Sequence, residues 1–175
     1  MRQHGELNHV FESVAQYGFF ATLFALFFSL GANAAELDDR HALDGVKTGK
    51  ALFDIASGNP NAIATTLEVI GETIDGLKRH GVEPEIVVAF RGPSVRFLTS
   101  NNSYIPAEHA ATEMELSGRI EQLAARGVRF EACGVTKRMM KIDNATLVKG
   151  VQPVANTFNS LIGYQAKGYA LIPIF

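Results

Sequence analysis

The residue best suited to chemistry is Cys133, the only cysteine in the chain. It follows residues 128–132 (VRFEA), which are predicted to form a strand, and Gly134 comes next. Three cations fall within the next two helical turns: Lys137, Arg138 and Lys141. A helix amino terminus and nearby cations both stabilise a thiolate over a thiol, and the thiolate is the nucleophilic form. The pattern predicts a reactive thiol; the alternative is a small buried core residue, the commoner use of a free cysteine.

Two other polar segments follow apolar runs, and both could lie at the same edge of the sheet as Cys133. Asp54 stands near the end of the first run, and Asn59 starts a helical pattern whose free amides could hold an anion. Arg91 follows the second run and could clamp an anionic substrate. Ligands of parallel sheets gather beyond the carboxyl ends of the strands, so these residues are candidates for one site with Cys133. The commoner roles are a hydrogen bond to nearby backbone amides for Asp54 and a surface position for Arg91.

Metal, cofactor and nucleic-acid chemistry find no support in the sequence. None of the five histidines shows ligand spacing with Cys133, so we predict no zinc site. The chain has no G-x-S-x-G, P-loop or G-x-G-x-x-G motif, so we predict no cofactor. The formal net charge is −2, without long blocks of like charge, which gives a nucleic-acid partner no electrostatic support.

The elements that must position these residues alternate between strand and helix. Apolar runs predict strands at residues 50–55, 85–90, 128–132, 151–155 and 169–174. Helical spacing and capping residues predict helices at residues 60–80, 106–126 and 158–167, a short helix or turn at 95–98, and a short helix after Asp143. Crossovers of this length indicate an α/β fold with a mainly parallel sheet and helices on both faces. Pro173 suggests that the last strand lies at an edge.

The first 35 residues are predicted to lie outside this fold. Residues 18–30 form a short apolar run, and residues 32–34 (ANA) fit the pattern read by signal peptidase. We expect residues 1–35 to be a signal peptide and the protein to be exported, to the periplasm. The alternatives are an uncleaved inner-membrane anchor with the domain outside the cytoplasm, and an internal helix. Residues 36–49 are predicted to be a linker and residues 50–175 a single domain.

Several segments resemble the DsrE/DsrF-like family. Residues 125–136 (ARGVRFEACGVT) are similar to its pattern of a helix ending in x-x-G-V, a short strand and a cysteine. Residues 53–60, 89–95 and 163–172 resemble its first strand and turn, its second strand end, and its last helix and strand. The resemblance implies a flavodoxin-like, three-layer α/β/α fold with a five-stranded sheet, and assembly into trimers or hexamers. It also implies a persulfide on the cysteine matching Cys133, as in the sulfur-relay members.

The leading hypothesis is a sulfur carrier. Cys133 would accept a sulfane sulfur as a persulfide and pass it to the thiol of a partner protein. Gly134 and Thr136 would leave access and backbone donors for the terminal sulfur, and Lys137 and Arg138 would favour the anion.

Two alternatives remain at the level of the sequence. The first is a non-catalytic oligomeric module that binds a small ligand or anion near Asp54, Asn59 and Arg91, with Cys133 as a packing residue. The second is a disulfide between chains through Cys133, since one cysteine cannot form an intramolecular bond.

Overall fold

The computed structural model describes residues 37–105 and 107–175, and one compact unit spans Asp39–Phe175. Its strands are β1 (Thr48–Ile55), β2 (Glu83–Phe90), β3 (Arg129–Cys133), β4 (Val151–Val154) and β5 (Ala170–Ile174). Its α-helices are α2 (Arg40–Leu43), α3 (Pro60–Arg79), α4 (Ala110–Ala125), α5 (Gly134–Met140) and α6 (Thr157–Ala166). Short 3₁₀ helices are η2 (Gly92–Leu98), η3 (Asn102–Tyr104), η4 (Ala107–His109) and η5 (Asn144–Thr146).

The five strands form one sheet in the order β4-β3-β2-β1-β5, and every neighbouring pair is parallel. The predicted parallel α/β fold is therefore confirmed. The two edge strands each contain a proline, Pro153 in β4 and Pro173 in β5. A proline cannot donate to a further strand, so its place at an edge, predicted for Pro173, follows from its chemistry.

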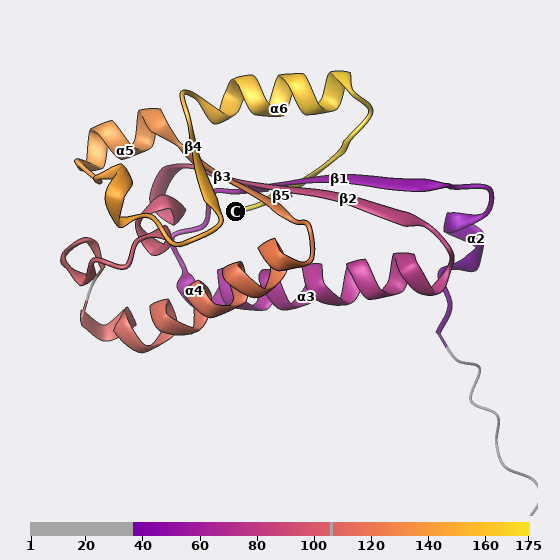
Figure 1. The fold of residues 1–175 in the computed structure, drawn as a ribbon, viewed down its shortest axis with the longest axis horizontal. Coiled ribbons are helices and arrows are strands. Elements are labelled where there is room, and N and C mark those ends of the chain that lie inside the picture. The colour runs from indigo at the N-terminus through magenta and orange to yellow at the C-terminus, as the bar shows by residue number, and fades with distance from the viewer. Residues whose placement is uncertain (1–36, 106) are drawn as a thin grey trace, which may run out of the picture. The chain divides into compact units, whose positions relative to one another are not determined.

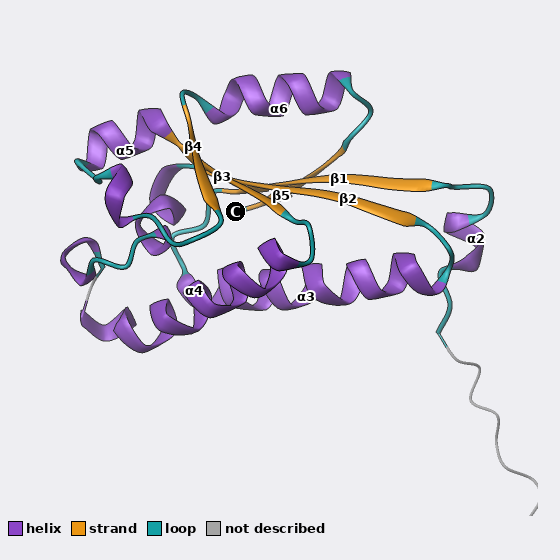
Figure 2. Ribbon diagram, viewed as in Figure 1, coloured by secondary structure: helices purple, strands orange, loops and turns teal. Residues whose placement is uncertain are grey.

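Helices cover the two faces of the sheet unequally (Figure 1). On one face, α3 and α4 pack side by side, and their apolar side chains share a large core with β1, β2 and β3. On the other face α6 covers a small core of Leu52, Val87 and Ala89. Figure 2 shows the strands as one layer between these two sets of helices. The three layers follow from strands that are apolar on both faces.

The helix α3 begins and ends where its sequence predicts. The side chain of Asn59 accepts hydrogen bonds from the backbone N–H groups of Asn61 and Ala62, and Pro60 occupies the first helical position. After Arg79 the chain turns through Gly81, whose φ of +71° is a conformation that side chains disfavour. The apolar stripe packs against the sheet, with Ile63, Leu67, Ile70 and Ile74 buried and Leu77 partly buried.

Three local expectations need adjustment. The segment predicted as a linker contains α2, and β1 begins at Thr48 rather than at Lys50. The short helix after β3 begins at Gly134, directly after the strand, while Asp143 caps only the 3₁₀ turn of η5 through the N–H of Ala145. The sequence allows a helix start after Cys133 but does not fix its first residue, because Gly134 begins α5 without a side-chain cap.

The predicted signal peptide or anchor, residues 1–35, lies outside the described residues. Within residues 37–105 and 107–175, no helix combines the length and hydropathy that crossing a membrane requires.

Candidate active site around Cys133

Cys133 lies where three elements meet. It is the last residue of β3 and, with extended backbone angles, the residue that precedes α5. Its strand pairs with β2 on one side and with β4 on the other, and Cys133 itself aligns with Val154. The chain continues from β4 directly into α6, so the beginnings of α5 and α6 both lie beside the thiol. The position at the carboxyl end of the sheet is the one that the sequence predicts.

Two threonines set the ionisation of the thiol. Burial disfavours the charged form, but hydrogen bonds from the side chain and backbone of Thr157, and from the backbone and side chain of Thr136, stabilise the thiolate. Together these hydrogen bonds outweigh burial and lower the pKa of Cys133 to about 7. The thiol is therefore substantially ionised at neutral pH, whereas an ordinary cysteine is mostly protonated.

The hydroxyl of Thr157 is a notable feature of this site. Thr157 is 1% exposed, and its oxygen has no hydrogen-bond partner of ordinary geometry among the described residues. The Cys133 sulfur is the acceptor that this hydroxyl approaches, so the donor is held ready for added negative charge there. Because this buried donor has no other acceptor among the described residues, it favours the thiolate form of Cys133.

An arginine–carboxylate pair closes the site on the β1 and β2 side. Arg91 donates from Nε to Oδ1 of Asp54 at 2.8 Å and from a terminal nitrogen to Oδ2 at 2.9 Å. The hydrogen bond with Asp54 raises the pKa of Arg91, burial opposes this, and the charges of Asp54 and Cys133 add to the rise. The guanidinium carbon lies 5.6 Å from the ring centre of Phe158 and 6.0 Å from that of Phe175. These contacts hold a fixed positive charge near the sulfur.

Thr136 is itself held in place by the end of β2. The N–H of Gly92 donates to the Thr136 hydroxyl oxygen at 3.1 Å, which leaves the hydroxyl hydrogen for the sulfur. Ser94 donates to the carbonyl oxygen of Ile55 at 2.8 Å and so ties the same turn to β1. The donors around Cys133 are therefore fixed by the ends of neighbouring strands.

The structure shows a role for Gly134 other than the open approach to the thiol that we expected from the sequence. A Cβ atom at this position would lie 2.5 Å from the carbonyl oxygen of Val154 and 3.0 Å from that of Ala155. Glycine therefore allows α5 to start in close contact with the β4–α6 connection.

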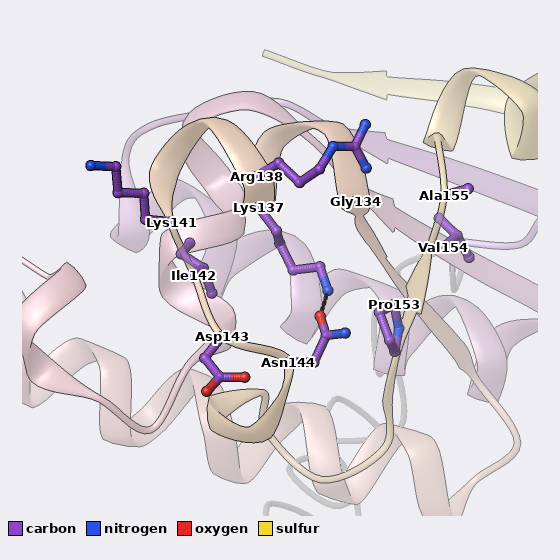
Figure 3. A pocket seen from close by; sticks show the side chains of 10 residues that line it. All are labelled: Gly134, Lys137, Arg138, Lys141, Ile142, Asp143, Asn144, Pro153, Val154 and Ala155. Carbon is purple, nitrogen blue, oxygen red and sulfur yellow. Dashed lines mark hydrogen bonds between the residues drawn. The ribbon is translucent and has the colours of Figure 1, made fainter.

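The basic residues after Cys133 line a neighbouring cavity (Figure 3). Lys137 is 4% exposed, and its ammonium group donates to the side-chain oxygen of Asn144. Burial lowers the pKa of Lys137, against the opposite effects of the Asp143 and Cys133 charges. Arg138 is exposed on the next position of α5.

The structure thus brings together some of the predicted residues and separates others. Asp54, Arg91, Cys133 and Thr136 form one cluster, and the charge of Lys137 reaches the thiol. Asn59 instead caps α3, and Arg138 lines the cavity. The sequence did not identify Thr157, Phe158 or Phe175 as site residues. The one signal was Asn156, a residue type that often caps helices and so marks the start of α6. In the described part of the chain, no group of three or more potential metal ligands of the histidine, cysteine or carboxylate types occurs.

Comparison with known proteins places this arrangement in a family. The sequence model of the DsrE/DsrF-like family matches residues 50–174, from within β1 to the end of β5. The chain belongs to the DsrE/DsrF-like family. A solved structure of a protein of unknown function, MTH1491 from Methanobacterium thermoautotrophicum, shares the fold of this DsrE-like domain, with a TM-score of 0.58 and 22% sequence identity. The match covers 71% of this chain and 98% of that one. No curated protein matches the DsrE-like chain.

Proposed function

We propose that this DsrE-like protein carries sulfane sulfur as a persulfide on Cys133 and passes it to the thiol of a partner protein. Membership of the family implies a function of the sulfur-relay type in general. The observation that carries the specific proposal is the thiol with a pKa of about 7, held between donors from Thr136 and Thr157. A carrier needs an ionised thiol and donors for the sulfur it receives, and it needs no further acid–base set.

Loading is a displacement at sulfur. The Cys133 thiolate attacks the sulfane sulfur of a donor, a new S–S bond forms, and the bond between that sulfur and the donor breaks. The leaving group departs with the bonding electron pair, so no external oxidant or reductant is required. Unloading repeats the step: the partner thiolate attacks the outer sulfur and Cys133 leaves as a thiolate.

The surroundings suit the terminal sulfur of a persulfide. That sulfur is anionic at neutral pH, and the hydroxyl of Thr157 is a donor without another partner. The guanidinium of Arg91 supplies a charge that is always positive and that Asp54 holds in place. We therefore assign Thr157 and Arg91 to stabilising the loaded state.

Intact mass measurement tests this function. The full chain is treated with inorganic polysulfide, and excess reagent is removed without a thiol reductant. The intact masses of the wild type and of the Cys133→Ser variant are then compared. We expect the wild type to gain the mass of one sulfur atom, a gain that dithiothreitol reverses, and the variant to gain nothing. A wild type that gains no sulfur, or a variant that gains as much, contradicts the proposal.

We also propose that the protein acts outside the cytoplasm after removal of residues 1–35. The support is the short apolar run followed by a small-x-small sequence. The mass of the protein recovered from its native host measures the cleavage, and a full-length cytoplasmic product would contradict it.

A further inference from the structure

A cavity of about 510 Å³ lies next to the start of α5, between α5, the segment before η5, and β4. Its wall begins at Gly134, the residue after Cys133, and includes apolar groups from Ile142, Pro153 and Val154 (Figure 3). Cavities of about 300–1,000 Å³ hold small organic ligands, so this one exceeds the needs of a simple inorganic anion.

The cavity has an excess of positive charge. It is lined by three cations and one carboxylate: Lys137, Arg138, Lys141 and Asp143. The exposed side chains of Arg138 and Lys141 make no hydrogen bond or ion pair with any described residue. The carboxylate of Asp143 accepts a hydrogen bond from the backbone of Ala145. Two positive charges are therefore available to a ligand.

Lys137 provides a second, independent observation. It is 4% exposed, yet among the described residues its ammonium forms no ion pair with a carboxylate. Its hydrogen-bond partner is the neutral amide of Asn144, toward which the side chain points in Figure 3. The nearby charges of Asp143 and Cys133 do not fully offset its burial. A buried charge is ordinarily paired, so this cation favours a further anion in the cavity.

We propose that the cavity binds a low-molecular-weight organic persulfide that carries carboxylate groups, and that this molecule is the sulfur donor to Cys133. The inference rests on the proposed carrier function. The cations bind the carboxylates, and the apolar wall contacts the organic part. The Cys133 thiolate attacks the outer sulfur of the donor R–S–SH, the S–S bond of the donor breaks, and R–S⁻ leaves with its electron pair. Cys133 retains the outer sulfur as a persulfide, and the proton of that sulfur passes to solvent at neutral pH.

The probe for binding is reduced glutathione, a tripeptide thiol with two carboxylates that matches the leaving group. Titration calorimetry uses the full chain with Cys133→Ser, so no sulfur chemistry contributes to the heat. We expect binding that weakens about tenfold when two charge-assisted contacts are lost in Arg138→Gln/Lys141→Gln. Both residues are exposed, so this variant retains the fold. The control Lys78→Gln/Lys149→Gln removes two exposed lysines elsewhere and changes binding less than about twofold.

Three outcomes overturn the inference. In the first, the Cys133→Ser parent binds no glutathione. In the second, the cavity variant binds glutathione as well as the control does. In the third, sulfate and thiosulfate displace glutathione at equal concentration, which would show that the cavity selects ligands by charge alone.

Loading assays separate this inference from the carrier function. If wild-type protein takes sulfur from polysulfide but the parent variant does not bind glutathione, the cavity assignment fails and the carrier function stands. If binding occurs but no donor loads the wild type, the carrier function fails, and the delivery role of the cavity fails with it.

Discussion

At the scale of single residues, the chemistry of Cys133 depends on hydroxyl groups more than on cations. The sequence directs attention to Lys137, Arg138 and Lys141, in and just after α5. Yet the pKa of the thiol is lowered by hydrogen bonds with Thr157 and Thr136. A hydroxyl can rotate to follow the sulfur as its charge changes, which a lysine fixed by Asn144 cannot do. The charge of the unloaded thiolate is therefore stabilised mainly by short, neutral donors.

The pH dependence of alkylation is the first prediction. The rate of reaction with iodoacetamide should rise with pH and reach half its maximum near pH 7, the pKa of the folded thiol. The same chain unfolded in urea should show a midpoint of about 8.5. Because the folded pKa is the lower, the stabilisation from the thiolate is present above the unfolded value and is lost as the pH falls through about 7. Coincident midpoints, or a folded thiol inert at every pH, would contradict this.

The role of Thr157 gives a second prediction. In Thr157→Val the donor is lost without leaving a buried polar group, so the alkylation midpoint should move up by about one pH unit. The control Thr73→Val, which removes a hydroxyl bonded within α3, should leave the midpoint unchanged. An unshifted midpoint in Thr157→Val would exclude the hydroxyl as a donor to the thiolate.

At the scale of elements, the site depends on how closely α5 begins against the β4–α6 connection. Gly134 makes this contact possible, and the salt bridge between Arg91 and Asp54 joins the ends of β1 and β2 beside it. The close contact at Gly134 and the salt bridge together hold the backbone around Cys133 in position.

The third prediction compares two glycines. Gly134→Ala should destabilise the protein by about 1–3 kcal/mol, because the new methyl group meets the backbone oxygen of Val154. Gly118→Ala in α4, where the added atom meets open space, should be neutral or stabilise by about 0.5–1 kcal/mol. Urea unfolding measures both, and equal effects of the two changes would show that the close approach is unimportant.

The fourth prediction concerns the buried carboxylate. Arg91→Leu leaves Asp54, which is 4% exposed, without its partner and should cost about 3 kcal/mol of stability. Asp54→Leu/Arg91→Leu removes both charges and should cost clearly less. Thermal unfolding at neutral pH measures the two variants; a double variant as unstable as the single would mean that packing, not the unpaired charge, sets the cost.

At the scale of the whole molecule, the sequence predicts the layers well and the site in part. Apolar runs and the caps of α3 are local signals, so the bounds of the strands and of this helix are predicted to within two residues. The pairing of Arg91 with Asp54 and the approach of Thr157 to Cys133 join segments far apart in the chain. No local pattern encodes such contacts, because they arise only when β1, β2, β3 and α6 come together.

Self-association is the fifth prediction. We propose that the homo-oligomer expected from the family resemblance buries large apolar side chains exposed on α6 and around β5: Phe158, Ile162, Leu171 and Phe175. Ile162→Asp should then shift the sedimentation coefficient to that of a smaller species. Met114→Asp, an equally exposed site on α4, should leave it unchanged. A wild type that sediments as a monomer contradicts the proposal.

The unequal cover of the sheet has a further consequence for reactivity. The face under α6 has the smaller core, so separation of this helix should be an opening of low free energy, visible as fast amide exchange. Such an opening would expose Cys133 but carry Thr157 away from it. The opening that exposes the thiol therefore also makes it less ionised. The sulfur is most nucleophilic while α6 is docked. A partner that displaces α6 must supply its own hydrogen-bond donor to the thiolate.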